Sequence, residues 1–308
     1  MALFFLYFFM IKMKYKNYLE WELKMKNIYS ISGSTIFVDS CFEYLIKEPL
    51  KEFVKETNED DYDIKIVVKP DIGIVNAKGK IVYDDNMCKI YKSKDKVYRE
   101  MYLGYKNRIS IFEYNTKNNK VLECYVDGNE LNKIFNIYNI FSMIGFEYLL
   151  FLNKAMILHS SFISYDGNGI LFTAPSQTGK STQADLWEKY QGAEIINGDR
   201  AGIKKEDGVF YGYGLPYAGS SKIYKNKREA IKAIIVLRQG KENKIRRLNS
   251  IEAFKYLYSE MMVNTWNEEF INGISDMIMD LISKVPIYMM ECLPDESAVN
   301  LLKKELNI

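Results

Sequence analysis

The sequence predicts an α/β protein: a phosphate-loop (P-loop) domain with a mixed β-sheet, preceded by a strand-rich α+β domain. Two observations carry this prediction. A short apolar run at 170–172 leads into a loop that contains Pro and Gly, and an amphipathic segment at 181–190 follows it. Upstream, short β-branched and aromatic runs separated by polar turns fill residues 27–125. The first pattern is strand, loop and helix, and the second is typical of an antiparallel sheet.

Composition excludes several classes of protein. Of the 308 residues, 48% are hydrophobic and 27% are charged, as in a soluble globular protein, and a net charge of +2 does not indicate nucleic-acid binding. The four cysteines (Cys41, Cys88, Cys124, Cys292) contain no C-x-x-C pair, which argues against a disulfide framework or a zinc site and favours reduced thiols in the cytoplasm. The single histidine, His159, excludes a multi-histidine metal site.

The chain begins with an aromatic-rich apolar run at residues 1–11. A membrane-spanning helix needs about 20 residues, and the run has neither the basic start nor the cleavage site of a secretory signal. It is either an interfacial anchor or an upstream extension, with the natural start at Met13 or Met25. We favour the extension, because an ordinary strand pattern begins at Lys26. Residues 1–24 are therefore expected to lie outside the fold, and membrane association is disfavoured.

The first domain is expected to span 25–153. A helix is expected over 41–56, and a long apolar helix over 129–153 should join this domain to a second one at 154–308. No cluster of catalytic residue types occurs in the first domain. Its expected strands lie near 28–31, 36–38, 64–68, 80–83, 96–98, 109–112 and 121–125.

The second domain contains the pattern G-x-x-x-x-G-K-[ST] with Ala174 in place of the first Gly. Such a loop turns its backbone N–H groups inward, and the following helix adds its N-terminal donors, so that phosphate oxygens fit there. Gly179 allows close approach of the backbone, Lys180 would reach the β- and γ-phosphates, and Ser181 would hold Mg²⁺. The residues expected to bind the nucleotide are Ser176, Gln177, Thr178, Gly179, Lys180, Ser181 and Thr182.

Two further side chains are expected near this loop. An apolar strand at 155–164 contains His159 and is joined by a tight turn at 166–169 to the strand that enters the loop. His159 is either a buried structural residue or part of the site. A later strand at 193–200 ends at Asp199, where a second Mg²⁺ ligand is expected, although a simple turn residue would look the same. Arg200 could pair with this carboxylate or with phosphate oxygens.

The rest of the chain supplies supporting elements. The Gly- and Ser-rich loop 213–222 would close over a substrate or act only as a connector. A buried strand is expected at 233–237, a hairpin tip at 241–247, helices at 251–263, 268–283 and 295–306, and a strand at 287–290.

The second domain resembles a known family. The segments around His159-Ser-Ser, the loop at 171–187, Asn197-Gly-Asp-Arg and Leu215-Pro-Tyr-Ala-Gly-Ser-Ser resemble the HPr kinase/phosphorylase C-terminal-like serine kinases, over about 155–250. The resemblance implies the phosphoenolpyruvate carboxykinase-like nucleotide-binding fold. Kinases of this type also occur in bacterial peptide-modification gene cassettes, including those of lasso peptides.

The resemblance implies the following roles. The loop would bind ATP and Mg²⁺, His159 would assist catalysis, and Asp199 would ligate the metal and deprotonate the acceptor serine. The partner would be a serine-bearing peptide or protein, and self-assembly is implied because HPr kinases form hexamers. Two departures from the family occur. Asn197-Gly198-Asp199 has one Asp where the family has two adjacent ones, which argues against the bifunctional mechanism of HPr kinases. Ser160-Ser161 follows the histidine where HPr kinases carry Gly, which argues against HPr itself as the substrate.

Three functions remain open at this point. The first is an ATP-dependent kinase that acts on a hydroxyl, with Lys180, Asp199 and His159 as its catalytic residues. The second is a nucleotide-binding regulatory module without phosphoryl transfer, which the missing Asp favours. The third, a true phosphoenolpyruvate carboxykinase, ranks low because the chain is short and has one histidine.

Overall fold

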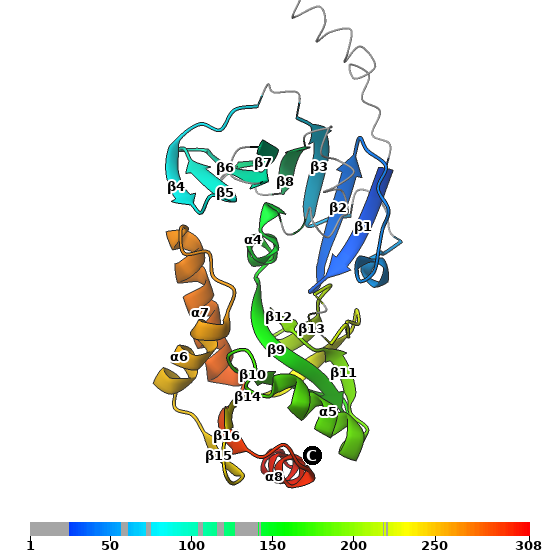
Figure 1. The fold of residues 1–308 in the computed structure, drawn as a ribbon, viewed down its shortest axis with the longest axis vertical. Coiled ribbons are helices and arrows are strands. Elements are labelled where there is room, and N and C mark those ends of the chain that lie inside the picture. Colours follow the sequence, from blue (N-terminus) through cyan, green and yellow to red (C-terminus); the bar gives the residue numbers. More distant parts are fainter. Residues whose placement is uncertain are drawn as a thin grey trace, which may run out of the picture.

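The computed structural model describes residues 25–56, 61–71, 75–103, 107–115, 120–126, 141, 143–217, 219 and 221–308. The extension expected at 1–24 lies outside these residues, as does much of the helix expected at 129–153. The described chain is an α/β structure with two large mixed sheets. The N-terminal sheet occupies the upper half of the molecule in Figure 1, and the C-terminal sheet with its helices occupies the lower half.

The N-terminal sheet has the strand order β1-β2-β3-β8-β7-β6-β5-β4. Every strand expected in this region forms, and β3 and β8 show the alternation of more and less buried positions that a pleated surface produces. The prediction missed only β5, a five-residue run next to polar turns. The strands are β1 (Met25–Ile31), β2 (Ser34–Ser40), β3 (Ile64–Pro70), β4 (Lys80–Asp84), β5 (Cys88–Lys92), β6 (Lys96–Leu103), β7 (Asn107–Asn115) and β8 (Val121–Val126).

Two helix predictions in this region are wrong. The expected helix at 41–56 is replaced by extended chain and a single 3-10 turn, η2 (Leu50–Phe53). Pro49 disfavours helical backbone in the residue before it and cannot donate to a preceding turn. The long helix expected to end at 153 is interrupted at Gly145, which has φ +72°. Helix α4 (Phe146–Leu152) starts after it, and residues 127–140 and 142 are outside the described part.

The C-terminal sheet has the order β10-β9-β12-β13-β14-β16-β15, with β11 paired to β9 and a further pairing of β10 with β14. Strands β10, β14 and β16 are parallel, so that their carboxyl ends meet at one edge. The strands are β9 (Ala155–Tyr165), β10 (Asn168–Thr173), β11 (Glu194–Asn197), β12 (Arg200–Glu206), β13 (Val209–Gly214), β14 (Arg228–Gln239), β15 (Lys244–Arg247) and β16 (Ile287–Cys292).

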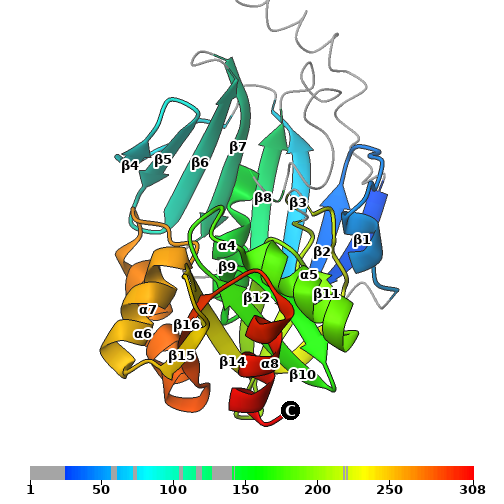
Figure 2. The same cartoon turned by 60° about the horizontal axis from the view of Figure 1, so that its bottom comes forward.

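Helices cover both faces of the parallel strands, as Figure 2 shows. Alternation along β10 determines the two cores: Ile170 and Phe172 belong to a cluster with Trp187 on one face, whereas Leu171 joins the larger cluster on the other. The first face is covered by α5 (Lys180–Gln191) and α8 (Glu296–Leu306), and the second by α6 (Ser250–Glu260) and α7 (Glu268–Lys284). The four helices expected in this half all form.

The hairpin expected to have its tip at 241–247 does not form between β14 and β15. β15 pairs antiparallel with β16, which follows two helices later, and not with β14. A local pattern of polar and basic residues indicates a turn but not which strand the chain returns to.

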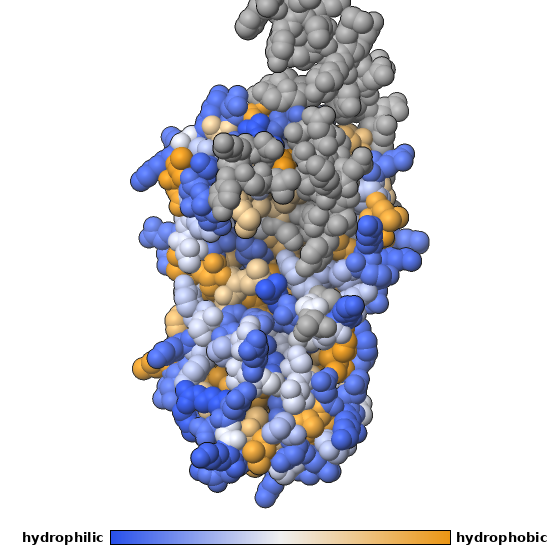
Figure 3. Space-filling view, in the orientation of Figure 1, coloured by the Kyte–Doolittle hydropathy of each residue, from blue (hydrophilic) through white to orange (hydrophobic). Residues whose placement is uncertain are grey.

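The larger hydrophobic cluster is continuous between the two sheets. It includes Tyr29 and Ile64 of the N-terminal sheet, Phe146 of α4 and Leu158 of β9. The face shown in Figure 3 is mostly hydrophilic over the lower half, with scattered small apolar areas. Within the described residues no helix has the length and apolar character needed to cross a membrane.

Candidate functional site

The strand, loop and helix expected around residues 170–190 are present, and the segment 174–179 keeps the name phosphate loop from its sequence pattern. Strand β10 ends at Thr173, and α5 begins at Lys180 after six loop residues. Gly179 has φ +118°, and a Cβ built on it would meet no atom within 4 Å, so the position requires glycine for its backbone angle rather than for space. Ala174 is fully buried and is not among the described residues with positive φ, so its replacement of the usual Gly costs no strain.

The side chain of Lys180 folds back into its own loop. It is 7% exposed, and its Nζ donates to the carbonyl oxygens of Ala174 at 2.7 Å and Pro175 at 3.3 Å. Burial lowers the pKa of the Lys180 ammonium, while the negative charges of Glu260 and Asp199 act in the opposite direction. A desolvated cation beside the backbone donors of a helix start is suited to bind phosphate oxygens.

The register of β9 brings His159 to this loop. Residues 155–159 pair with β12, and residues 160–165 pair with β10, so His159 lies where the strand changes partners. Arg200 is directly opposite His159 in the β12 ladder. The Thr173 hydroxyl, at the start of the phosphate loop, donates to the His159 carbonyl at 2.9 Å. The strand carrying the histidine is thereby tied to the strand that enters the loop.

The imidazole of His159 lies between two carboxylates. Its Nδ1 is 3.0 Å from Glu260 Oε2, and its Nε2 is 3.9 Å from Asp199 Oδ1. All three side chains are partly buried, with exposures of 24% for His159, 27% for Asp199 and 12% for Glu260. The two carboxylates thus share one imidazole beside Lys180. Carboxylates in this position can accept a proton from a hydroxyl.

Sequence reasoning missed Glu260. It is the last residue of α6, and the chain after it joins the edge of β9, where Met262 N–H donates to the Ile157 carbonyl at 3.0 Å. This contact sets Glu260 next to His159. One signal was available. Glu260 falls in the last turn of the helix expected at 251–263, where a negative charge interacts unfavourably with the helix dipole.

Asn197 lies in the turn before Asp199 and bonds to backbone groups on both sides of it. It is fully buried, and its Nδ2 donates to the carbonyls of Leu215 at 2.8 Å and Tyr217 at 2.9 Å. Its Oδ1 accepts from the backbone N–H of Asp199 at 2.9 Å and of Arg200 at 3.0 Å. The strand expected to run through 193–200 therefore breaks here, into β11 and β12. Asn197 fixes both the turn that presents Asp199 and the loop that follows β13.

Asn197→Asp is expected to destabilise the fold by about 3 kcal/mol or more, because a buried carboxylate would face two carbonyl oxygens without a donor. The free energy of unfolding in urea measures this. Asn168→Asp, in an exposed turn where Nδ2 bonds the Asp166 carbonyl, is the matched control and should change stability by less than about 1 kcal/mol. Equal effects of the two substitutions would contradict the role of Asn197.

The loop after β13 packs directly on Asp199. Gly219 has φ +55°, and a Cβ at this position would lie 2.7 Å from Asp199 Cβ. Arg200 Nε is 3.7 Å from Asp199 Oδ2, and the Arg200 guanidinium lies over the Tyr217 ring at 5.1 Å. Of the loop expected at 213–222, positions 218 and 220 are outside the described residues. The described part of this loop therefore contacts Asp199 and Arg200 directly.

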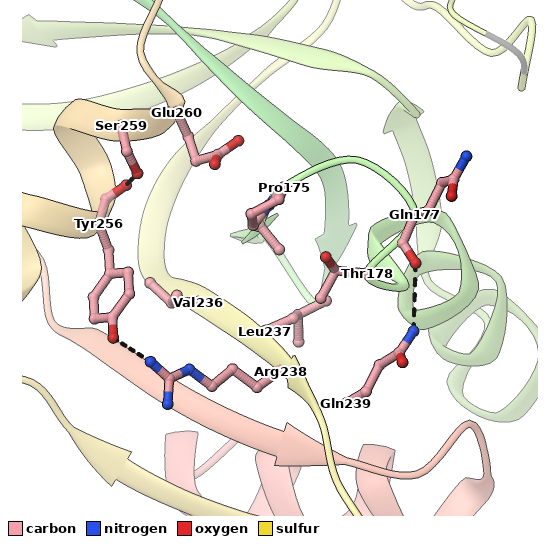
Figure 4. A pocket seen from close by; sticks show the side chains of 11 residues that line it. Pro175, Gln177, Thr178, Val236, Leu237, Arg238, Gln239, Tyr256, Ser259 and Glu260 are labelled. Atoms are coloured by element: carbon pink, nitrogen blue, oxygen red, sulfur yellow. Dashed lines mark hydrogen bonds between the residues drawn. The ribbon is translucent and has the colours of Figure 1, made fainter.

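Two clefts border the phosphate loop. The first, of about 610 Å³, lies between the loop, the end of β14 and α6, and Glu260 is at its edge. Figure 4 shows Arg238 and Tyr256 joined by a hydrogen bond on one side of this cleft and Pro175 on the other. The second, of about 380 Å³, lies between the start of α5 and the chain after β16. Gln239, which bonds the Gln177 carbonyl at 3.4 Å, borders both.

The oxygen-bearing side chains near the loop are of the types that hold Mg²⁺ together with a bound nucleotide. Mg²⁺ takes one or two carboxylates, and the substrate phosphates and water complete its shell. Asp199 offers a carboxylate, and Ser181, exposed in the first turn of α5, offers a hydroxyl. Among the described residues no group of three or more His, Cys, Asp and Glu forms a self-contained metal cage. Ser176 and Thr182 are also exposed at the loop, and Thr178 is half-buried.

Comparison with known proteins gives likenesses among solved structures alone. No family model matches the chain, and no curated protein matches it. Among solved structures, the HPr(Ser) kinase/phosphatase from Coxiella burnetii is similar at 14% sequence identity with a TM-score of 0.29, covering 49% of this chain and 99% of that chain. A likeness at this level gives no information about activity, so the function proposed below rests on the site alone.

Proposed function

We propose that this protein is an ATP-dependent kinase that transfers the γ-phosphoryl group to a hydroxyl, that of a serine in a peptide or protein. The observation that carries the proposal is the convergence of Lys180 of the phosphate loop with His159, Asp199 and Glu260, which come from three other elements. A cation for phosphate and carboxylates for a hydroxyl proton are the parts that phosphoryl transfer needs.

In the proposed reaction the acceptor hydroxyl oxygen forms a bond to the γ-phosphorus. The bond between that phosphorus and the bridging oxygen breaks, and its electron pair remains on the β-phosphate of ADP. Asp199 accepts the hydroxyl proton, and His159, held through Nδ1 by Glu260, supports the charge of that carboxylate. Lys180 leaves its loop carbonyls to contact the β- and γ-phosphate oxygens. Bound Mg²⁺, held by Ser181 and Asp199, would neutralise charge on the transferred group.

The alternative, a nucleotide-binding module without transfer, rested on the missing Asp. Glu260 weakens that argument, because it brings a second carboxylate to His159 from a different element. The described part of the loop at 213–222 contacts Asp199, and the cleft of about 610 Å³ reaches Glu260. Because these two carboxylates flank His159, we assign the acceptor to this side. We also retain the division into a strand-rich unit at 25–153 and a nucleotide-binding unit at 154–308 as part of the proposal.

The direct test is incubation of the purified protein with ATP and Mg²⁺, with and without the peptides encoded beside its gene, followed by mass spectrometry. A phosphate-sized gain on a peptide serine is the expected result. Tight ATP binding without transfer to any peptide or protein offered would favour the binding module instead.

The affinity for ATP is expected to fall at alkaline pH. Phosphate oxygens need the protonated form of Lys180, and burial lowers its pKa below the ordinary lysine value. The affinity for ATP is therefore highest below the pKa of Lys180 in the free protein, and it falls as the pH rises through that pKa. Calorimetric titration across this range measures the effect. Lys180→Arg should remove the pH dependence, and an affinity that stays constant up to the ordinary pKa of lysine would contradict the assignment.

A further inference from the structure

The second cleft, which we call the α5–β16 cleft, has no role in the reaction as described so far. Its volume of about 380 Å³ is within the range of about 300–1,000 Å³ typical of small-molecule sites. It is bordered by Thr182 and Gln183 of α5, by Gly240 after β14, and by Leu293 after β16. It therefore lies at the carboxyl ends of two parallel strands, on the α5 side of the phosphate loop.

The polarity of the site assigns one end of a bound nucleotide to this cleft. The charges that act on Lys180 are those of Glu260 and Asp199, so the γ-phosphate end lies toward the carboxylates. In a loop of this type the lysine reaches the β- and γ-phosphates, and the backbone N–H groups hold the α- and β-phosphates, which are nearer the nucleoside. A triphosphate laid along the loop in this direction continues past Thr182 into the α5–β16 cleft.

An independent feature of the cleft points to a ligand with a hydrogen-bond donor. The side chain of Gln183 is 2% exposed, and its Nε2 donates to Cys292 Sγ at 3.3 Å and to the Leu293 carbonyl at 3.4 Å. Its Oε1 is buried and has no hydrogen-bond partner among the described residues. A buried acceptor without a donor is costly, and most such groups in native proteins are satisfied.

We propose that the α5–β16 cleft binds the base of the donor nucleotide and that Gln183 Oε1 accepts a hydrogen bond from an exocyclic amino group. This inference rests on the proposed function, since it identifies the base end of the same ATP site. The 6-amino group of adenine supplies the donor. Hypoxanthine has a carbonyl oxygen at that position, so that two acceptors would face each other. ATP is therefore bound in preference to ITP.

Calorimetric titration of the unmodified protein with ATP, ITP and inorganic tripolyphosphate tests this. ATP is expected to bind at least about tenfold more tightly than ITP, and tripolyphosphate measures the phosphate loop without any base. Equal affinities for ATP and ITP would overturn the inference while leaving the proposed function intact. Failure of ATP and tripolyphosphate alike would overturn both.

Gln183→Met keeps the length of the side chain and removes the amide, and it should bring the ATP-to-ITP ratio close to one. Gln191→Met is the matched control at the far end of α5, where the amide accepts from Lys303, and it should keep the ratio of the unmodified protein. Thermal unfolding verifies that both variants fold. A Gln183→Met protein that folds and retains the full preference would show that another group reads the base.

Cys292 provides a second readout that needs no substitution. It borders the cleft and is partly exposed, whereas Cys41, Cys88 and Cys124 are buried. Burial raises the pKa of the Cys292 thiol, so alkylation is followed at alkaline pH by mass spectrometry. ATP should slow the modification of Cys292 and tripolyphosphate should not, because only ATP fills the cleft. Equal protection by both, or by neither, would place the base elsewhere.

Discussion

Lys180→Met is expected to lower the turnover number for phosphoryl transfer by about a thousandfold. The change removes the one cation that is buried inside the phosphate loop, where low polarity strengthens its action on the transferred group; single groups of this kind contribute factors of about 10²–10³. Methionine has a similar length and fills the same buried space, so the fold is expected to persist. Steady-state kinetics and thermal unfolding on the same sample measure the two effects.

Lys189→Met is the control for this experiment. Lys189 is on the same helix, exposed, with its ammonium over the Tyr190 ring. Its replacement should leave the turnover number within twofold. Activity of Lys180→Met within a factor of ten of the unmodified protein would rule out the proposed mechanism.

Asp199→Asn is expected to produce a loss of similar size, between about 10² and 10⁴ in turnover number. The asparagine amide cannot take up the proton of the substrate hydroxyl, and it is a weaker ligand for Mg²⁺ than a carboxylate. The backbone turn should survive, because it is fixed by the hydrogen bonds from the Asp199 and Arg200 N–H groups to Asn197. Turnover and ATP affinity are measured at several Mg²⁺ concentrations.

These measurements separate the two functional proposals. A kinase loses turnover at every Mg²⁺ concentration, whereas a binding module loses only the part of its nucleotide affinity that depends on the metal. Asp276→Asn, on the exposed side of α7, is the control for a change of one charge and should behave as the unmodified protein does. A metal-dependent loss of affinity with no turnover in either protein would decide for the module.

Local patterns in the sequence predicted most elements of this fold, because each depends on nearby residues. Alternation along β10 and the glycine before α5 are examples, and the expected order of strand, loop and helix is present there. Predictions failed where one residue interrupted a long apolar pattern. Pro49 prevented a helix, and Gly145, with its positive φ, divided another. The pairing of β15 with β16 depends on contacts between distant segments, which a local pattern does not contain.

The candidate site shows the same limit. Lys180 belongs to a contiguous motif and could be named from the sequence. Asp199 was expected from its place at a strand end, and His159 from the tight turn that joins its strand to the one entering the loop. Glu260 joins them only because the chain after α6 adds to the edge of β9. The role of Asn197 was equally hidden, since two of its four hydrogen bonds reach carbonyls 18 and 20 residues further along the chain.

A line of stacked side chains runs from α4 to the reaction centre. Phe146 meets Tyr217 edge-on at 5.6 Å, and Tyr217 supports the guanidinium of Arg200 beside Asp199. Phe146 also packs on Phe141, which contacts Tyr29 of the N-terminal sheet. Linkage is reciprocal, so a ligand that favours one placement of Arg200 also favours one packing of this aromatic line. The packing of the strand-rich half is thereby linked to the placement of Arg200 beside Asp199.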